Sequence, residues 1–140
     1  MRIVWGPELF LGHRVLDSQH EELVALLNEL DDVLAGDADR VADVLRRLDA
    51  YVLFHFGSEE SLMLGLKQPE QLAAHRAEHR HFVEQMVALR ELAGNSPAAA
   101  IAQLADYLTH WLRNHILVSD RRLAQALNQH AAAEQRSLTR

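Results

Sequence analysis

The sequence predicts an all-α protein, an up-down-up-down four-helix bundle with an irregular N-terminal arm. Apolar residues recur at steps of three and four along four long segments, which is the period of a helix with one buried face. Short connections containing glycine or proline separate these segments, and short connections favour antiparallel neighbours. No segment shows the alternation typical of a strand, and no internal repeat is visible.

The arm is expected to cover residues 1–16, with Trp5 as an apolar anchor. A first helix should begin at about Asp17, with Asp17 or Ser18 as its N-cap, and end at Gly36. The second helix should run from Asp37 or Asp39 to about Leu64, with Gly65 as its stop. The third should run from Pro69 to Leu92 or Ala93, with Gly94 as its stop. The fourth should begin at Ser96-Pro97 and fray beyond Asn128.

Composition bounds the class of protein. With 140 residues, 49% of them hydrophobic, we expect one domain over 1–140, with the bundle over about 17–128 and a polar tail over about 129–140. The absence of cysteine excludes disulfides and thiolate metal sites. A net charge of −6 argues against a nucleic-acid or anionic-membrane partner. No apolar run could span a membrane and no secretion signal is visible, so we expect a cytoplasmic monomer.

Polar side chains interrupt the inward face of every predicted helix. A carboxylate removed from water without a partner costs several kcal/mol, so an inward Glu must be wet, paired or bound to a metal. A spacing of four residues puts two side chains on one helix face, where they can share a metal ion. The inward polar residues are His20 in the first helix, His55 and Glu59 in the second, His75 and His79 in the third, and His115 in the fourth.

A single histidine on an apolar face is more often a hydrogen-bonded core residue than a metal ligand. Here convergence favours a metal, because five imidazoles among leucine, valine and phenylalanine would otherwise need five separate hydrogen-bonding solutions. Facing helices of bundles build di-metal centres from such side chains. His13, His81 and His110 fall outside the inward faces, and we exclude them. His130 and Glu134 have ligand spacing but lie in a polar segment without an apolar face, so we exclude them too.

Asp120 is the remaining candidate, and its spacing does not decide its direction. It follows His115 by five residues, which is about 140° around a regular helix. A regular period would therefore not place this carboxylate on the inward face. The residues alone leave the role of Asp120 open.

Four motifs together resemble the bacterial hemerythrins: Trp5-x3-Leu9-x2-Gly12-x4-Asp17-x-Gln19-His20, His55-Phe56-x2-Glu59-Glu60, His75-x3-His79, and Trp111-Leu112-x2-His115-x4-Asp120. The resemblance extends from Trp5 to about Leu123 and fills all seven positions of the family's ligand pattern. Gln68-Pro69 stands where the family often has Tyr-Pro, which affects the loop between the second and third helices but not the ligands.

The resemblance implies a non-haem di-iron centre that binds dioxygen at one iron. Two carboxylates, with an oxo or hydroxo group, would bridge the irons, and imidazole ligands suit iron well. By this resemblance Glu59 and Asp120 bridge the irons. His75, His79 and His115 complete one iron, and His20 and His55 bind the other iron, which keeps an open position. The resemblance thus includes Asp120, which spacing leaves open.

Two apolar residues are expected to wall the oxygen site. Leu112 lies one turn before His115 on the inward face, and Phe56 directly follows His55. The resemblance implies the same positions. The alternative is that Leu112 and Phe56 are ordinary core residues.

The predicted function is reversible dioxygen binding for carriage, storage or delivery to an oxygen-using enzyme, and not catalysis. Two Fe(II), two carboxylates, one hydroxide and five neutral imidazoles leave a formal charge of about +1, which favours the reduced irons. No acid, base or nucleophile beyond the ligands lies on the inward faces. The alternatives are a di-iron enzyme that consumes nitric oxide or peroxide, and an oxygen sensor acting through a separate partner.

Overall fold

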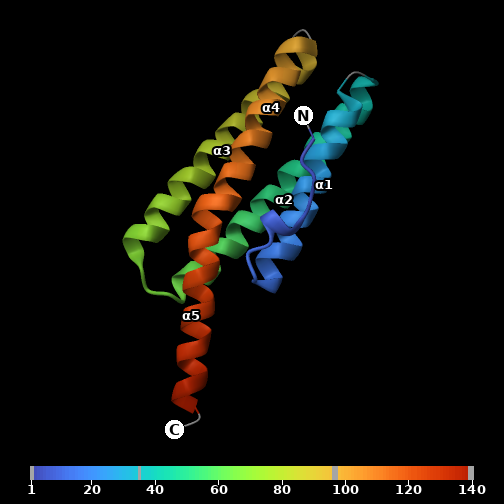
Figure 1. The fold of residues 1–140 in the computed structure, drawn as a ribbon. Helices are drawn as coiled ribbons and strands as arrows, with labels where there is room; N and C mark the ends of the chain where they lie inside the picture. The colour runs from blue at the N-terminus through green and yellow to red at the C-terminus, as the bar shows by residue number, and fades with distance from the viewer. Residues whose placement is uncertain (1, 35, 96–97, 139–140) are drawn as a thin grey trace.

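Four long antiparallel helices form a bundle, and a fifth helix continues from the fourth (Figure 1). The computed structural model describes residues 2–34, 36–95 and 98–138, and no strand occurs among them. The elements are η1 Pro7–Leu9, α1 Arg14–Val33, α2 Ala38–Leu64, α3 Pro69–Asn95, α4 Ala98–His115, the π-helical turn η2 Ile116–Asp120, and α5 Arg121–Leu138. Each of α1, α2 and α3 packs on the helix that follows it, and α1 also packs on α4, which closes the bundle. The predicted fold class is therefore confirmed.

The first helix begins earlier than predicted. It starts at Arg14, and His13 is its N-cap, so the assignment of Asp17 or Ser18 to this role was wrong. The Asp17 carboxylate instead accepts hydrogen bonds from the backbone N–H groups of residues 11–13, at 2.8 to 3.2 Å. From the first turn of the helix it therefore holds the end of the arm.

The later boundaries agree more closely with the sequence. Asp37 caps α2 through a hydrogen bond from the N–H of Asp39, and Gly65 follows its last residue. Pro69 begins α3 as predicted. That helix runs through the predicted stop at Gly94 to Asn95, a difference within the usual fraying of helix ends. The predicted Ser96-Pro97 cap lies outside the described residues.

The last helix extends much further than predicted. Fraying beyond Asn128 was expected, but α5 remains helical to Leu138 and projects past the other helices (Figure 1, red). The residues after Asn128 include three alanines, two glutamines and an arginine, all good helix formers. A contact of 3.1 Å between Nε2 of His130 and the carboxylate of Glu134, one turn apart, adds support. Intrinsic helix propensity thus outweighs the missing apolar face.

The bundle buries a leucine- and valine-rich core, with Ile3 and Leu9 anchoring the arm to it. Trp5 is half-buried and packs against this core, as predicted. None of the described helices combines the length and apolar character needed to cross a membrane. Nine polar residues are buried in this core among the described residues: Gln19, His20, His55, Glu59, His75, His79, Thr109, His115 and Asp120.

Candidate metal centre

Seven of these buried polar residues gather at one level of the bundle. They divide into two groups of four ligand atoms, each group lying within 4.8 Å, and Glu59 belongs to both groups. The most exposed of the seven side chains, His75, has only 6% of its surface exposed. One group contains Glu59, His75, His79 and His115, and the other contains His20, His55, Glu59 and Asp120. The structure thus brings together all seven residues singled out from the sequence.

The local backbone explains why Asp120 points inward. Residues 116–120 form a π-helical turn, in which the backbone N–H of Arg121 donates to the carbonyl oxygen of Ile116, five residues back. This turn holds one residue more than an α-helical turn. Side chains five positions apart therefore come onto one face, and both His115 and Asp120 are buried. Spacing based on a regular α-helix could not have placed this carboxylate.

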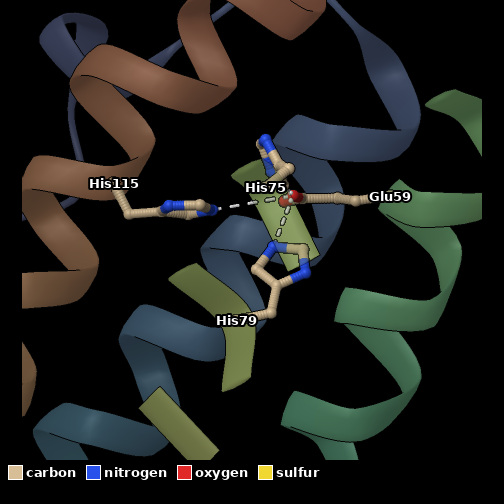
Figure 2. Close-up of side chains that lie close together, drawn as sticks. All are labelled: Glu59, His75, His79 and His115. Atoms are coloured by element: carbon tan, nitrogen blue, oxygen red, sulfur yellow. Dashed lines mark hydrogen bonds and ion pairs between the residues drawn. The ribbon is translucent and has the colours of Figure 1, made fainter. Parts of the chain in front are cut away.

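Three imidazoles converge on one carboxylate oxygen, as Figure 2 shows. The Nε2 atoms of His75, His79 and His115 lie 2.7, 3.1 and 3.7 Å from Oε2 of Glu59. The other oxygen, Oε1, lies 3.3 Å from Nε2 of His20 and 2.5 Å from Nε2 of His55. Glu59 therefore presents one oxygen to each group of histidines.

Asp120 repeats this division between the two histidine groups. Its Oδ2 lies 2.8 Å from Nε2 of His20. Its Oδ1 lies 3.1 Å from Nε2 of both His75 and His115. Each of the two carboxylates therefore lies close to both histidine groups. This is the arrangement needed to bridge two neighbouring cations.

Hydrogen bonding does not satisfy the cluster. Among the described residues, five buried side-chain atoms have no hydrogen-bond partner: Nδ1 of His20, Nε2 of His55, Nε2 of His115 and both oxygens of Asp120. Buried polar atoms of this kind are rare because each costs free energy. Some nitrogen and oxygen atoms of the cluster face one another at the distances found between ligands of one metal ion, but without the geometry of a hydrogen bond. Such atoms fit metal cations placed between them.

The charges of the cluster also favour bound cations. Burial and the charge of Glu59 raise the pKa of Asp120, but the neighbouring imidazoles outweigh both and lower this pKa to about 2. Burial also raises the pKa of Glu59, yet the surrounding imidazoles hold it well below its usual value. Burial lowers the pKa of His20 and His75, whereas the two carboxylates raise each to about 9. At His55 burial dominates and lowers the pKa. Both carboxylates stay ionised, so protons or metal cations must balance them.

Further polar residues fix the histidine rings from behind. The Nδ1–H group of His115 donates to Glu78 at 2.7 Å, that of His79 to Glu60 at 3.0 Å, and that of His55 to Gln19 at 2.7 Å. Such bonds direct Nε2 toward a metal and make the imidazole a better ligand. The sequence analysis assigned no role to Glu78, and quoted Gln19 and Glu60 only within motifs. Their common signal is position, because each stands directly beside one of the seven residues in the chain.

The two predicted wall residues lie close to the cluster, but not in equivalent places. Phe56 is 3% exposed, and its ring stacks on His79 with centroids 3.8 Å apart and planes at 4°. Its closest ring contact is therefore with the three-histidine group, although His55 lies 5.8 Å away. Leu112 is 1% exposed. A role for either residue in walling an oxygen site stays a prediction.

A cavity of about 330 Å³ lies between the C-terminal end of α2, the start of α3 and α5. His75, Glu78 and Ser119 form part of its wall, so it reaches the three-histidine group. On the other side of the cluster, His20 and His55 are fully buried. The two histidine groups therefore differ in their access to solvent.

The histidines excluded from the site are not buried. His13 caps α1, His81 is half-buried, and His110 is exposed. The side chains of His130 and Glu134 are 47% and 68% exposed and pair with each other on the projecting part of α5. Their exclusion is therefore consistent with the structure.

The core of this four-helix bundle holds two adjoining clusters of histidine and carboxylate side chains. These features define the class of bundle proteins that hold cations between facing helices. The family profile described as "Hemerythrin HHE cation binding domain" matches residues 11–127. The chain therefore belongs to the hemerythrin HHE family.

Relatives and solved structures agree with this assignment. The chain is 32% identical to a bacteriohemerythrin of Stenotrophomonas maltophilia over 132 residues, covering 91% of this chain and 83% of the relative. It is 32% identical to a Pseudomonas aeruginosa bacteriohemerythrin over 121 residues, covering 84% and 76%. A crystal structure of a hemerythrin with a leucine-to-tyrosine substitution superposes with a TM-score of 0.76 at 27% identity, covering 89% of this chain and 96% of that one.

Removal of a bridging carboxylate should empty the site. Wild-type protein is expected to hold two metal ions per chain, and Glu59→Ala should lose most of both and about 3–5 kcal/mol of stability, because the imidazoles lose their shared partner. Elemental analysis and thermal unfolding measure the two effects. His130→Ala, with the same ligand spacing in its segment, should change neither. Full metal retention in Glu59→Ala would contradict the bridging role.

Loss of a residue behind the ligands should weaken the site without abolishing it. Glu78→Leu removes the acceptor of the His115 Nδ1–H group and should lower metal affinity about 10- to 100-fold. Competition with a coloured chelator gives the affinity. Glu84→Leu, at an exposed position on the same helix, is the matched control and should bind metal as the wild type does. Equal affinities for the two variants would show that Glu78 has no orienting role.

Proposed function

We propose that this chain binds dioxygen reversibly at a non-haem di-iron centre, for carriage, storage or delivery. The observation that carries the proposal is that Glu59 and Asp120 each offer one oxygen to each histidine group. The bacteriohemerythrin relatives support the same function. Action as a monomer in the cytoplasm remains a prediction from the sequence.

The ligand count supports different roles for the two irons. With both carboxylates bridging, three histidines give one iron five protein ligands, and two histidines give the other iron four. One bridging oxygen would complete the first iron at six ligands and leave the second with an open position. Two irons would supply the electrons that hold dioxygen in a reduced form and recover them on release. The imidazole-rich set keeps the centre positive, which favours the reduced state.

Burial on the two-histidine side also supports reversible binding. His20, His55, Glu59 and Asp120 have no exposed surface, so solvent does not reach this part of the cluster directly. Water and protons at a bound, reduced ligand would promote its loss and leave the irons oxidised. Gln19 orients His55 and also donates to Ser58, so a hydrogen-bonded chain holds this ring in place.

A carrier is favoured over an enzyme because the core offers no spare proton donor. Beyond the seven candidate ligands, the buried polar residues in the described part of the chain are Gln19 and Thr109. The Thr109 hydroxyl donates to the carbonyl oxygen of Ala105, and Gln19 is engaged with His55 and Ser58. Neither side chain is a general acid. An enzyme that reduces nitric oxide or peroxide needs a supply of protons at the metal.

Repeated gas cycles test the function. After anaerobic reduction, the visible absorption band should appear under oxygen and disappear under argon over many cycles; one-way conversion to the oxidised form would favour an enzyme.

His20→Ala should abolish or greatly weaken the oxygen response but retain metal in the three-histidine group, whereas His110→Ala, at an exposed position, should behave as wild type. Normal oxygen binding by metal-loaded His20→Ala would overturn the assignment of the open position.

The wall of the oxygen site can be tested at Leu112. Leu112→Ala should cost about 2–5 kcal/mol of stability as a core truncation and, as a lost wall, also speed autoxidation several-fold. The decay of the oxygenated absorption band is measured while each protein is fully folded. Leu108→Ala is the matched control, since Leu108 is equally buried one turn further from His115. Equal decay in both variants would remove Leu112 from the wall.

A further inference from the structure

The buried cluster has one side that solvent can approach. The cavity of about 330 Å³ lies between the end of α2, the start of α3 and α5, and His75 and Glu78 form part of its lining. The side chain of Glu78 is 44% exposed, whereas His20 and His55 on the other side of the cluster have no exposed surface. Four further lining residues are exposed glutamines, which place the mouth of the cavity at the surface: Gln68, Gln71, Gln125 and Gln129.

The ring of His75 is held less firmly than the other two rings of its group. The Nδ1–H groups of His79 and His115 donate to Glu60 and Glu78, which fix those rings from behind. Among the described residues, no hydrogen bond reaches Nδ1 of His75, whose polar contacts all run through Nε2. This ring can therefore turn aside into the cavity without breaking a hydrogen bond behind it.

Glu78 presents a carboxylate both to the cavity and to a candidate ligand. It accepts a hydrogen bond of 2.7 Å from His115 and one of 2.8 Å from the hydroxyl group of Ser119, which also lines the cavity. A half-exposed carboxylate attracts a hydrated cation, and the amide oxygens of the four glutamines can replace some of the water around it. Neutral oxygens bind a cation weakly enough for it to move on, which a route into a site requires.

We propose that divalent metal cations enter and leave the cluster through this cavity, past Glu78 and the ring of His75. The three-histidine group is then the first part of the cluster that a cation reaches. The inference rests on the proposed metal centre, but it concerns how the chain admits the ion and goes beyond dioxygen binding. Imidazole and carboxylate ligands bind Co²⁺ as well as Fe²⁺, so Co²⁺ is a suitable probe.

The alternative is a hollow left by imperfect helix packing, and kinetics separates the two. An obstacle placed in a route raises the barrier in both directions, so uptake and release slow by the same factor and the dissociation constant stays the same. A change that disturbs a ligand alters the dissociation constant instead. An obstacle in an unrelated hollow changes neither rate.

Two neighbouring alanines of α3 provide a matched test. Ala74 lines the cavity and Ala73 does not, and both are exposed, so each position should accept a larger side chain without loss of the fold. Release of Co²⁺ from each loaded variant to a coloured chelator is followed at concentrations where the rate no longer depends on the chelator. Ala74→Trp should release Co²⁺ several-fold more slowly than Ala73→Trp and wild type, with an unchanged dissociation constant in competition experiments. Equal release rates in the two variants, or a dissociation constant that changes as much as the rate, would overturn the route.

The charge at the mouth of the cavity gives a second test. Arg122 lines the cavity, is exposed, and makes no ion pair among the described residues. Because it repels an arriving cation, Arg122→Glu should raise the uptake rate, calculated as the release rate divided by the dissociation constant, by about twofold to fivefold at low salt and by less at high salt. Arg40→Glu makes the same charge change at an exposed position at the opposite end of α2 and should leave the rate unchanged. Equal uptake rates in these two variants at low salt would show that the cation enters elsewhere.

Neither measurement involves dioxygen, so the route and the proposed function can fail separately. Failure of both tests would overturn the route while oxygen cycling persists. A chain that takes up Co²⁺ as expected but never cycles with oxygen would overturn the proposed function and support the route. A chain that binds no Co²⁺ would overturn both.

Discussion

The structure depends on two carboxylates buried among five imidazoles. Glu59 and Asp120 have no exposed surface, and each raises the free energy of the other's ionised form. Only positive charge between them makes this arrangement stable, whether it comes from protons or from metal cations. Because the candidate ligands come from four helices and the π-helical turn, the same charge balance joins the four helices of the bundle. Fold and site are therefore one thermodynamic unit.

Periodicity predicted what depends on a single regular helix. Steps of three and four residues placed His20, His55, Glu59 and the other inward histidines correctly, because each lies in a regular α-helix. Asp120 failed this test since the π-helical turn changes the phase of the helix just before it. Only the family resemblance included it. The positions of Glu60 and Glu78 beside candidate ligands are a sequence signal, but which histidine ring each one holds depends on how neighbouring helices pack.

Local interactions explain two other differences between sequence and structure. Asp17 looked like a helix cap, but its carboxylate binds backbone groups of the arm, a contact that depends on where the arm turns. The projecting part of α5 lacks an apolar face, so periodicity gave no signal there, although its residues favour a helix by themselves. In both places a local interaction other than the helix cap or the apolar face determines the structure.

The π-helical turn ties the two sides of the centre to one continuous segment. Before the turn, α4 presents His115 to the cluster and Trp111 to the back of that ring. After it, Asp120 reaches across to His20 on the two-histidine side. A regular α-helix through residues 116–120 would keep the first arrangement and rotate Asp120 away. A π-helical turn is rare and less favourable than regular helix, and here it brings a second carboxylate into the buried cluster. Oδ1 of Asp120 lies 3.1 Å from the Nε2 atoms of His75 and His115, so this one carboxylate contacts both histidine groups.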